Sequence, residues 1–126
     1  MQYLMLLTID PATSGSPESA QPDDWSAYTQ ALIEAGIMVS GAGLQGAETA
    51  TTVQVRSGER LLTDGPFADT KEHLLGFYVI DVPDLDTALD WAAKVPNVRT
   101  GSVEVRPVLP NAEAARPDAT ASVAAG

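Results

Sequence analysis

The alternation of apolar and polar positions predicts six β-strands. Residues 3–9 form a continuous apolar run that ends at Asp10-Pro11, which is typical of a strand covered on both faces. Residues 51–56 alternate strictly and predict a half-buried strand, with Val53 and Val55 on one side, that the Ser57-Gly58 turn joins to a second strand as a hairpin over 51–63. Further strands are predicted over 37–44, 74–82 and 102–108.

The strand over 74–82 is apolar on both sides, which indicates a central position in the sheet. Alternation places Leu75, Phe77 and Val79 on one face of this strand. It places the other apolar side chains, Leu74, Tyr78 and Ile80, on the opposite face.

Two segments have the period of an α-helix instead. Residues 22–35 place Trp25, Tyr28, Leu32 and Ile33 on one face, with Pro22 suited to the first turn and Gly36 to the stop. A second helix begins after Asp84, the expected N-cap, and ends at Pro96. Its expected buried side chains are Leu85, Ala88, Leu89 and Ala92.

The order strand, helix, strand, hairpin, strand, helix, strand predicts an α+β fold. A split arrangement of this kind indicates a ferredoxin-like antiparallel sheet with two helices on one face and an inserted hairpin. Two helices can cover only one face of the sheet, yet the strands 3–9 and 74–82 are apolar on both faces. We therefore expect the second face to pack against another copy of the chain, forming a homodimer.

Composition and charge limit the number of domains and the kinds of cofactor and partner that we expect. The 126 residues suit one domain, assigned to 1–109, followed by an Ala- and Pro-rich tail at 110–126 that lacks a periodic apolar face. The absence of Cys excludes disulfides, and one His leaves little for a metal, so neither a metal site nor a cofactor is expected. A net charge of -10 argues against nucleic acid and anionic membranes as partners. The short apolar N-terminus lacks a basic flank, and we expect a cytoplasmic protein.

The stretch over 63–72, Thr-Asp-Gly-Pro-Phe-Ala-Asp-Thr-Lys-Glu, gathers polar side chains between two strands. It resembles the DGPF family of YCII-related domain proteins, which are small bacterial proteins of the dimeric α/β-barrel superfamily. The resemblance covers about residues 1–109. The matching positions outside the stretch are the N-terminal strand, the helix with Trp25, Tyr28, Leu32 and Gly36, Gly41 with Leu44, Gly76-Phe77-Tyr78 and Glu104-Val105-Arg106-Pro107.

The resemblance implies a dimeric α/β barrel but no agreed reaction. Related YCII proteins are suspected enzymes that carry a His–Asp pair. This chain has Asp69, His73 and Leu75 where the family usually has Glu, Gln and Gly. A His that the family usually lacks cannot be its common catalytic base.

Five side chains in or beside the stretch are candidates for a site. We consider Asp64, Thr70, Lys71 and Glu72 for contacts to a ligand, with Lys71 suited to an anion, and Asp64 with His73 for acid–base catalysis. Each has a purely structural alternative. Asp64-Gly65-Pro66 is a common turn sequence, the charged residues are typical of a solvated loop, and a lone His at a strand start is often a hydrogen-bonded structural residue.

Two classes of function fit these residues. One is a small-molecule site beside the 64–72 loop, either for binding alone or for an enzyme that uses acid–base chemistry. The other is a non-catalytic regulatory or protein-interaction module, because DGPF proteins are often encoded beside extracytoplasmic-function sigma factors, which implies a sigma-factor-related partner. A pocket lined by the candidate residues favours the first class, whereas a flat, exposed loop favours the second.

Overall fold

The computed structural model describes residues 1–13, 19–66 and 72–110. In chain order its strands and helices, with η for 3₁₀ turns, are β1 (Gln2–Ile9), η1 (Pro11–Thr13), α1 (Pro22–Glu34), β2 (Met38–Gly43), η2 (Ala47–Thr49), β3 (Thr51–Arg56), β4 (Glu59–Asp64), β5 (His73–Asp81), α2 (Leu85–Ala92), η3 (Pro96–Arg99) and β6 (Gly101–Pro107). Within these ranges, no helix is long and apolar enough to cross a membrane.

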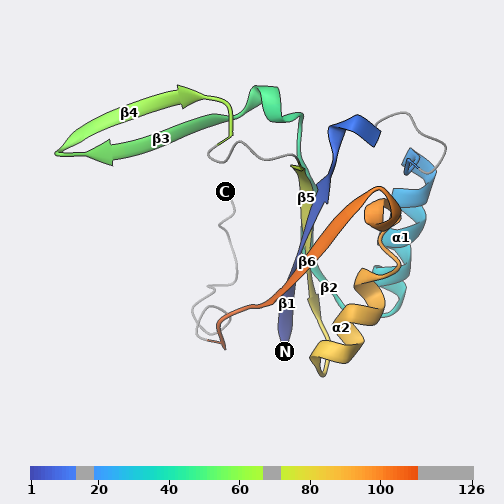
Figure 1. Ribbon diagram of the computed structural model, residues 1–126. Coiled ribbons are helices and arrows are strands. Elements are labelled where there is room, and N and C mark those ends of the chain that lie inside the picture. Colours follow the sequence, from blue (N-terminus) through green and yellow to red (C-terminus); the bar gives the residue numbers. More distant parts are fainter. Residues whose placement is uncertain (14–18, 67–71, 111–126) are drawn as a thin grey trace.

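Four strands form an antiparallel sheet in the order β2-β5-β1-β6, while β3 and β4 form a separate hairpin. Both helices lie on one side of the sheet, and the hairpin extends toward the other side (Figure 1). This is the ferredoxin-like α+β arrangement with an inserted hairpin that the order of elements predicts. The arrangement is consistent with the fold of dimeric α/β barrels.

Local sequence signals set the ends of both helices. Before α1, Gln21 and Asp24 form a reciprocal capping box, and after it Gly36 adopts a φ of 74° that a residue with a Cβ rarely adopts. Asp84 caps α2 as expected, accepting a hydrogen bond of 2.9 Å from the backbone N–H of Thr87. A second bond from the Thr87 hydroxyl, together with this one, lowers the pKa of the Asp84 carboxyl.

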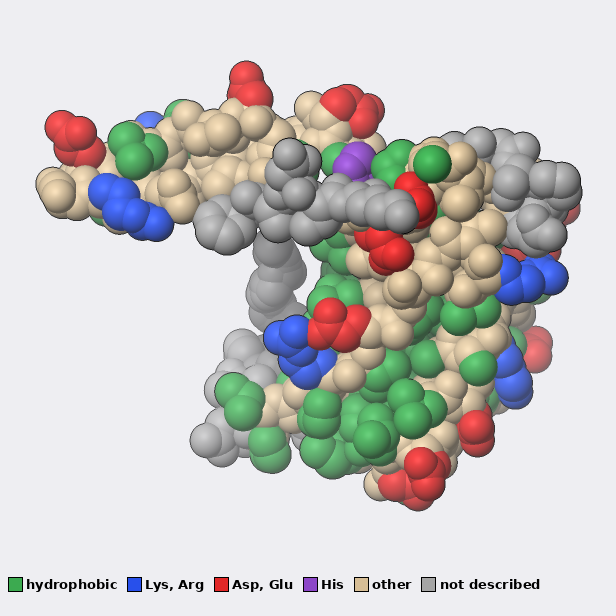
Figure 2. Space-filling view, in the orientation of Figure 1, with side chains coloured by type: hydrophobic (Ala, Val, Ile, Leu, Met, Phe, Trp, Pro, Cys, Tyr) green, Lys and Arg blue, Asp and Glu red, His purple; other side chains and the backbone are tan. Residues whose placement is uncertain are grey.

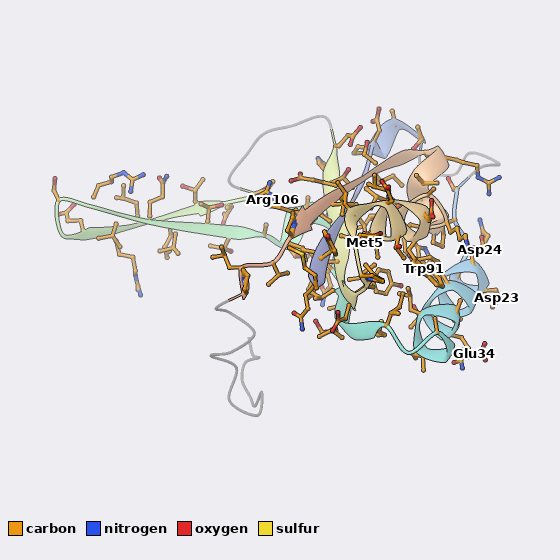
Figure 3. All side chains as sticks on the ribbon, turned by 90° about the horizontal axis from the view of Figure 1, so that it is seen from below. Met5, Asp23, Asp24, Glu34, Trp91 and Arg106 are labelled. Carbon is orange, nitrogen blue, oxygen red and sulfur yellow. The ribbon has the colours of Figure 1, made fainter. Side chains whose placement is uncertain are left out.

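The core lies between the sheet and the two helices. Met5, Leu32 and Ile80 are fully buried there, while Asp23, Asp24 and Glu34 point outward from α1 (Figure 3). Burying an aliphatic side chain of this size contributes about 1.5–3 kcal/mol each. The covered face of the sheet therefore accounts for much of the stability of the domain.

Three aromatic rings join α1 to the sheet and to α2. The ring of Tyr28 makes edge-to-face contacts with Tyr78 at 5.4 Å and with Trp91 at 6.3 Å between centroids. The Tyr28 hydroxyl donates a 2.8 Å hydrogen bond to the carbonyl of Trp91. Burial raises the pKa of this hydroxyl, and the nearby Tyr78 adds to the effect. Tyr28 is thus a core residue, as expected.

A bulge changes the expected faces of β5. The pairing with β1 runs from Leu7 opposite Gly76 to Thr8 opposite Leu74, so Leu75 has no partner. The alternation shifts at this point. Leu75 packs against the core and Leu74 is 44% exposed, the reverse of what strict alternation from Tyr78 and Ile80 predicts.

Neither helix covers the second face of the sheet. The register places Leu4 opposite Val79 and Leu6 opposite Phe77 on this face, and all four side chains remain partly exposed in the single chain. Glu104 and Arg106 of β6 lie on the same face and form an ion pair at its edge. The face is therefore apolar at its centre and charged at its margin.

The hairpin of β3 and β4 lies apart from this sheet (Figures 1 and 2). Val53 and Val55 are 57% and 61% exposed, so the prediction that this strand is half-buried through its valines is wrong. Alternation is present, but no other element of the described chain packs over the valines. The two-stranded hairpin, called the arm below, leaves them in solvent.

Candidate functional site

A cavity of about 500 Å³ lies at the base of the arm, beside the start of β5. Its walls come from Thr8 of β1, from the connection over 44–50, from Pro66, and from residues 72–74. These segments are far apart in sequence and meet because β5 pairs with β1 on one side and β2 on the other. Volumes of this size are typical of sites for small molecules.

Two ionisable side chains, Glu72 and His73, line this cavity and are half-buried. The Thr8 hydroxyl donates a 2.8 Å hydrogen bond to Oε1 of Glu72. Thr8 is itself held from behind, because Nδ2 of the buried Asn97 donates to its carbonyl at 2.6 Å. These contacts fix the position of the Glu72 carboxylate, which can accept hydrogen bonds or a proton.

The Asp-Gly-Pro turn fastens the arm to the other wall of the cavity. The Gly65 N–H donates a 2.7 Å hydrogen bond to the carbonyl of Ala50, and the Thr52 hydroxyl donates to the Gly65 carbonyl at 2.8 Å. Gly65 has a φ of 102°, where a side chain would be strained. This glycine therefore allows the turn that brings Pro66 next to Ala50 in the cavity wall.

The structure brings together some of the candidate residues and not others. Glu72 and His73 share the cavity. Asp64 is exposed at the end of β4, opposite Thr51, and is not among the described residues that line the cavity. Thr70 and Lys71 lie outside the described residues. The convergence of Asp64, Lys71 and Glu72 on one pocket stays a prediction.

Comparison with known proteins identifies the family. The family model of the YCII-related domain matches residues 1–112. The chain belongs to this family. An uncharacterized protein of Rhizobium meliloti (strain 1021) is 47% identical over 87 residues, which cover 68% of this chain and 70% of that protein. The match agrees with the resemblance read from the DGPF stretch, and it assigns no reaction.

Sequence reasoning missed two parts of the cavity wall in this YCII-related domain, Thr8 and the 44–50 connection, and also Asn97, which holds Thr8 from behind. Thr8 interrupts the apolar run of β1 one residue before its end, and a hydroxyl at that position is a signal that could have been noticed. The 44–50 connection is marked in the sequence only by Gly46 and its polar residues. Asn97, in the turn before β6, is 1% exposed, which nothing in its neighbourhood of the sequence indicates.

Among the described residues of this YCII-related domain, no group of three or more His, Asp or Glu side chains could hold a metal ion. The described side chains that line the cavity beside Glu72 include a carboxylate, an imidazole and hydroxyls.

Proposed function

We propose that this YCII-related domain protein binds a small polar molecule in the cavity beside Glu72 and His73. The observation that carries the proposal is the Glu72 carboxylate, held by Thr8 in the wall of a cavity of about 500 Å³ and adjacent in sequence to His73. A few polar groups in a concave site with apolar walls are the usual features of small-molecule recognition. Lys71, next to Glu72 in the sequence, favours an anionic group on the ligand.

Acid–base chemistry is the reaction class that these groups support. A carboxylate can accept a proton, and an imidazole can donate or accept one near neutral pH. Because the DGPF proteins that this chain resembles usually have Gln at position 73, we assign the role of the base to the Glu72 carboxylate and treat His73 as a further contact to the ligand.

The single His makes the binding test simple. The imidazole signals of His73 are the only ones in an NMR spectrum of this chain. We expect these signals to shift when small mono- and dicarboxylates are titrated to millimolar concentration, and we expect weaker responses to neutral amides of the same size. Lys71→Ala should weaken the carboxylate response without changing the melting temperature.

Matched carboxylate variants complete this test. Glu72→Gln removes the charge in the cavity, whereas Glu59→Gln makes the same change at the exposed start of β4. Binding altered by the first variant and not by the second supports the site. If no compound of either class moves the His73 signals, the ligand proposal is wrong.

The uncovered sheet face supports a homodimer as the working form of the protein. Leu4, Leu6, Phe77 and Val79 form its apolar centre, and packing two such faces together removes them from water. Light scattering should report twice the mass of the chain. Leu6→Asp should produce monomers, while Leu62→Asp, the same change on the arm, serves as the control. A folded wild-type monomer at micromolar concentration contradicts the proposal.

The arm favours a second function, that of a protein-interaction module. Val53 and Leu62 are directly opposite each other on one face of the hairpin, and Val55 lies beside them. An exposed apolar cluster of this kind is typical of a protein-binding surface. If the partner is related to an extracytoplasmic-function sigma factor, a two-hybrid signal with that protein should be lost in Leu62→Asp and kept in Glu72→Gln. The reverse pattern supports the ligand site instead.

A further inference from the structure

A second cavity, of about 360 Å³, lies between α1 and the edge of the sheet. Trp25 and Thr29 of α1 form one wall, and Met38 of β2 lies at the sheet edge. Leu7 of β1, Ala42 of β2, and Leu75, Phe77 and Tyr78 of β5 also line the cavity. It shares no lining residue with the cavity beside Glu72. The two cavities are therefore separate places on the molecule.

Two of the described residues that line this cavity, Thr29 and Tyr78, bring hydroxyl groups that contact each other. The oxygens of Thr29 and Tyr78 are 2.7 Å apart, and either can be the donor. One O–H of the pair makes the bond between them, which leaves the O–H of the accepting residue able to donate once more. Among the described residues this pair has no other hydrogen-bond partner. A ligand oxygen or nitrogen that accepts a hydrogen bond would satisfy it.

The surrounding packing holds this hydroxyl pair in place. A Cβ at Gly41 would lie 2.8 Å from Cδ1 of Tyr78, so the absence of a side chain there allows the tyrosine ring to lie against β2. On its other side the ring makes an edge-to-face contact with Tyr28. Tyr78 is 7% exposed. Packing on both sides of the ring therefore fixes the position of the Tyr78 hydroxyl.

We propose that this second cavity binds a small, flat, uncharged molecule with an apolar ring and one hydrogen-bond acceptor, such as an aryl ketone. The side chains of Trp25, Met38 and Leu75 supply aromatic and polarisable apolar surface for the ring. Among the described residues, no Asp, Glu, Lys, Arg or His lines the cavity, so a charged group would lose its water shell without a partner of opposite charge from this part of the chain. The Thr29–Tyr78 pair donates to the acceptor.

A matched pair of probes tests both parts of this proposal. Acetophenone carries a ring and a carbonyl acceptor, whereas ethylbenzene has nearly the same shape and no acceptor. Binding is followed by NMR through the indole N–H of Trp25 and the ε-methyl group of Met38, with Trp91 as the internal reference. We expect both probes to shift the signals of Trp25 and Met38, and acetophenone to bind more tightly.

Conservative variants identify the contribution of the hydroxyls. Tyr78→Phe and Thr29→Val keep the size of the side chains and should keep the fold, which thermal melting checks. Because a hydrogen bond contributes roughly a threefold to tenfold difference in affinity, each variant should weaken acetophenone by about that factor and leave ethylbenzene unchanged. Equal effects on the two probes would overturn the role of the hydroxyl pair.

Acetophenone binding in the second cavity should not depend on the cavity beside Glu72. Glu72→Gln should leave acetophenone binding intact, and acetophenone should not shift the His73 imidazole signals. If neither probe moves the Trp25 and Met38 signals at its solubility limit, the proposal of a second binding cavity is wrong, whatever carboxylates do at His73. If Glu72→Gln abolishes acetophenone binding, the probe occupies the first cavity, and the proposal fails in that case also.

Discussion

Strands β3 and β6 have nearly the same sequence and opposite environments. β3 contains Val-Gln-Val-Arg and β6 contains Val-Glu-Val-Arg. In β6, Val103 and Val105 pack against the core that the helices cover. In β3, Val53 and Val55 are more than half exposed. Alternation identifies both segments as strands and says nothing about which of them has a covering layer.

The difference comes from the partners that each strand pairs with. β6 pairs with β1, which places Val103 opposite Leu7 and Val105 opposite Met5, two buried residues. β3 pairs only with β4 in the described structure. A two-stranded hairpin by itself is marginally stable in water, so the arm depends on its anchorage at Gly65.

The largest expected difference in the free energy of unfolding is between a substitution in the sheet and one in the arm. Ile80→Ala, at a fully buried position of β5, should lower the free energy of unfolding by about 2–5 kcal/mol, through lost burial and the cavity left behind. Leu62→Ala removes as many atoms from the arm, at a position 61% exposed, and should change it by no more than about 0.5 kcal/mol. Urea unfolding followed by circular dichroism measures both. A large cost for Leu62→Ala that grows with protein concentration would show that an assembly buries the arm.

A smaller difference in stability, between more closely matched positions, is expected for one valine of β6 and one of β3. Val105→Ala should destabilise the protein by about 1–2 kcal/mol, because the side chain is partly buried against the core. Val53→Ala, the same change in almost the same sequence, should fall within about 0.5 kcal/mol. Both are measured by the same urea titration. Equal costs for the two valines would contradict the contrast between the strands.

The smallest expected effect is at the N-cap of α2, in the helix-covered half of the molecule. The two hydrogen bonds from Thr87 lower the pKa of Asp84 in the folded state, so the carboxylate stabilises the fold above its ordinary pKa of about 3.9. That stabilisation is lost as the pH falls through the lowered folded pKa. Asp84→Ala should therefore reduce the melting temperature by a few degrees at neutral pH, and the gap to the wild type should narrow under strongly acidic conditions. Because Asp84 is exposed, the effect stays small, and a gap that widens in acid would contradict the assignment.

Much of the fold followed from local patterns. The apolar period of 22–35, with Pro22 before it and Gly36 after it, identified α1 to within a residue. Asp84 identified the start of α2 because an N-cap is a contact between residues close in sequence. The bulge at Leu75 was not predictable, because it depends on the register that β1 and β5 adopt across 60 or more residues of chain.

The sequence indicated part of the wall of the cavity beside Glu72, and the role of that cavity as a site stays a prediction. The cluster over 64–72 drew attention to Glu72 and His73, which do line a cavity. Thr8, which holds the Glu72 carboxylate, comes from a segment 64 residues earlier in the chain. Asp64 was included because it is near in sequence, yet it ends β4 on the exposed arm. Two residues that are close in the sequence need not share a cavity when the chain turns between them.

The sequence by itself determined the secondary structure, the order of elements and the family, because these depend on the period of apolar side chains, on capping residues and on a ten-residue motif. Only the tertiary structure decided which alternating strands are covered and which distant side chains share a cavity. The physical reason is that the side chains of a strand are buried only where another layer of the structure packs over them. The two helices cover one face of one sheet, and β3, with the same alternation as β6, lies outside it.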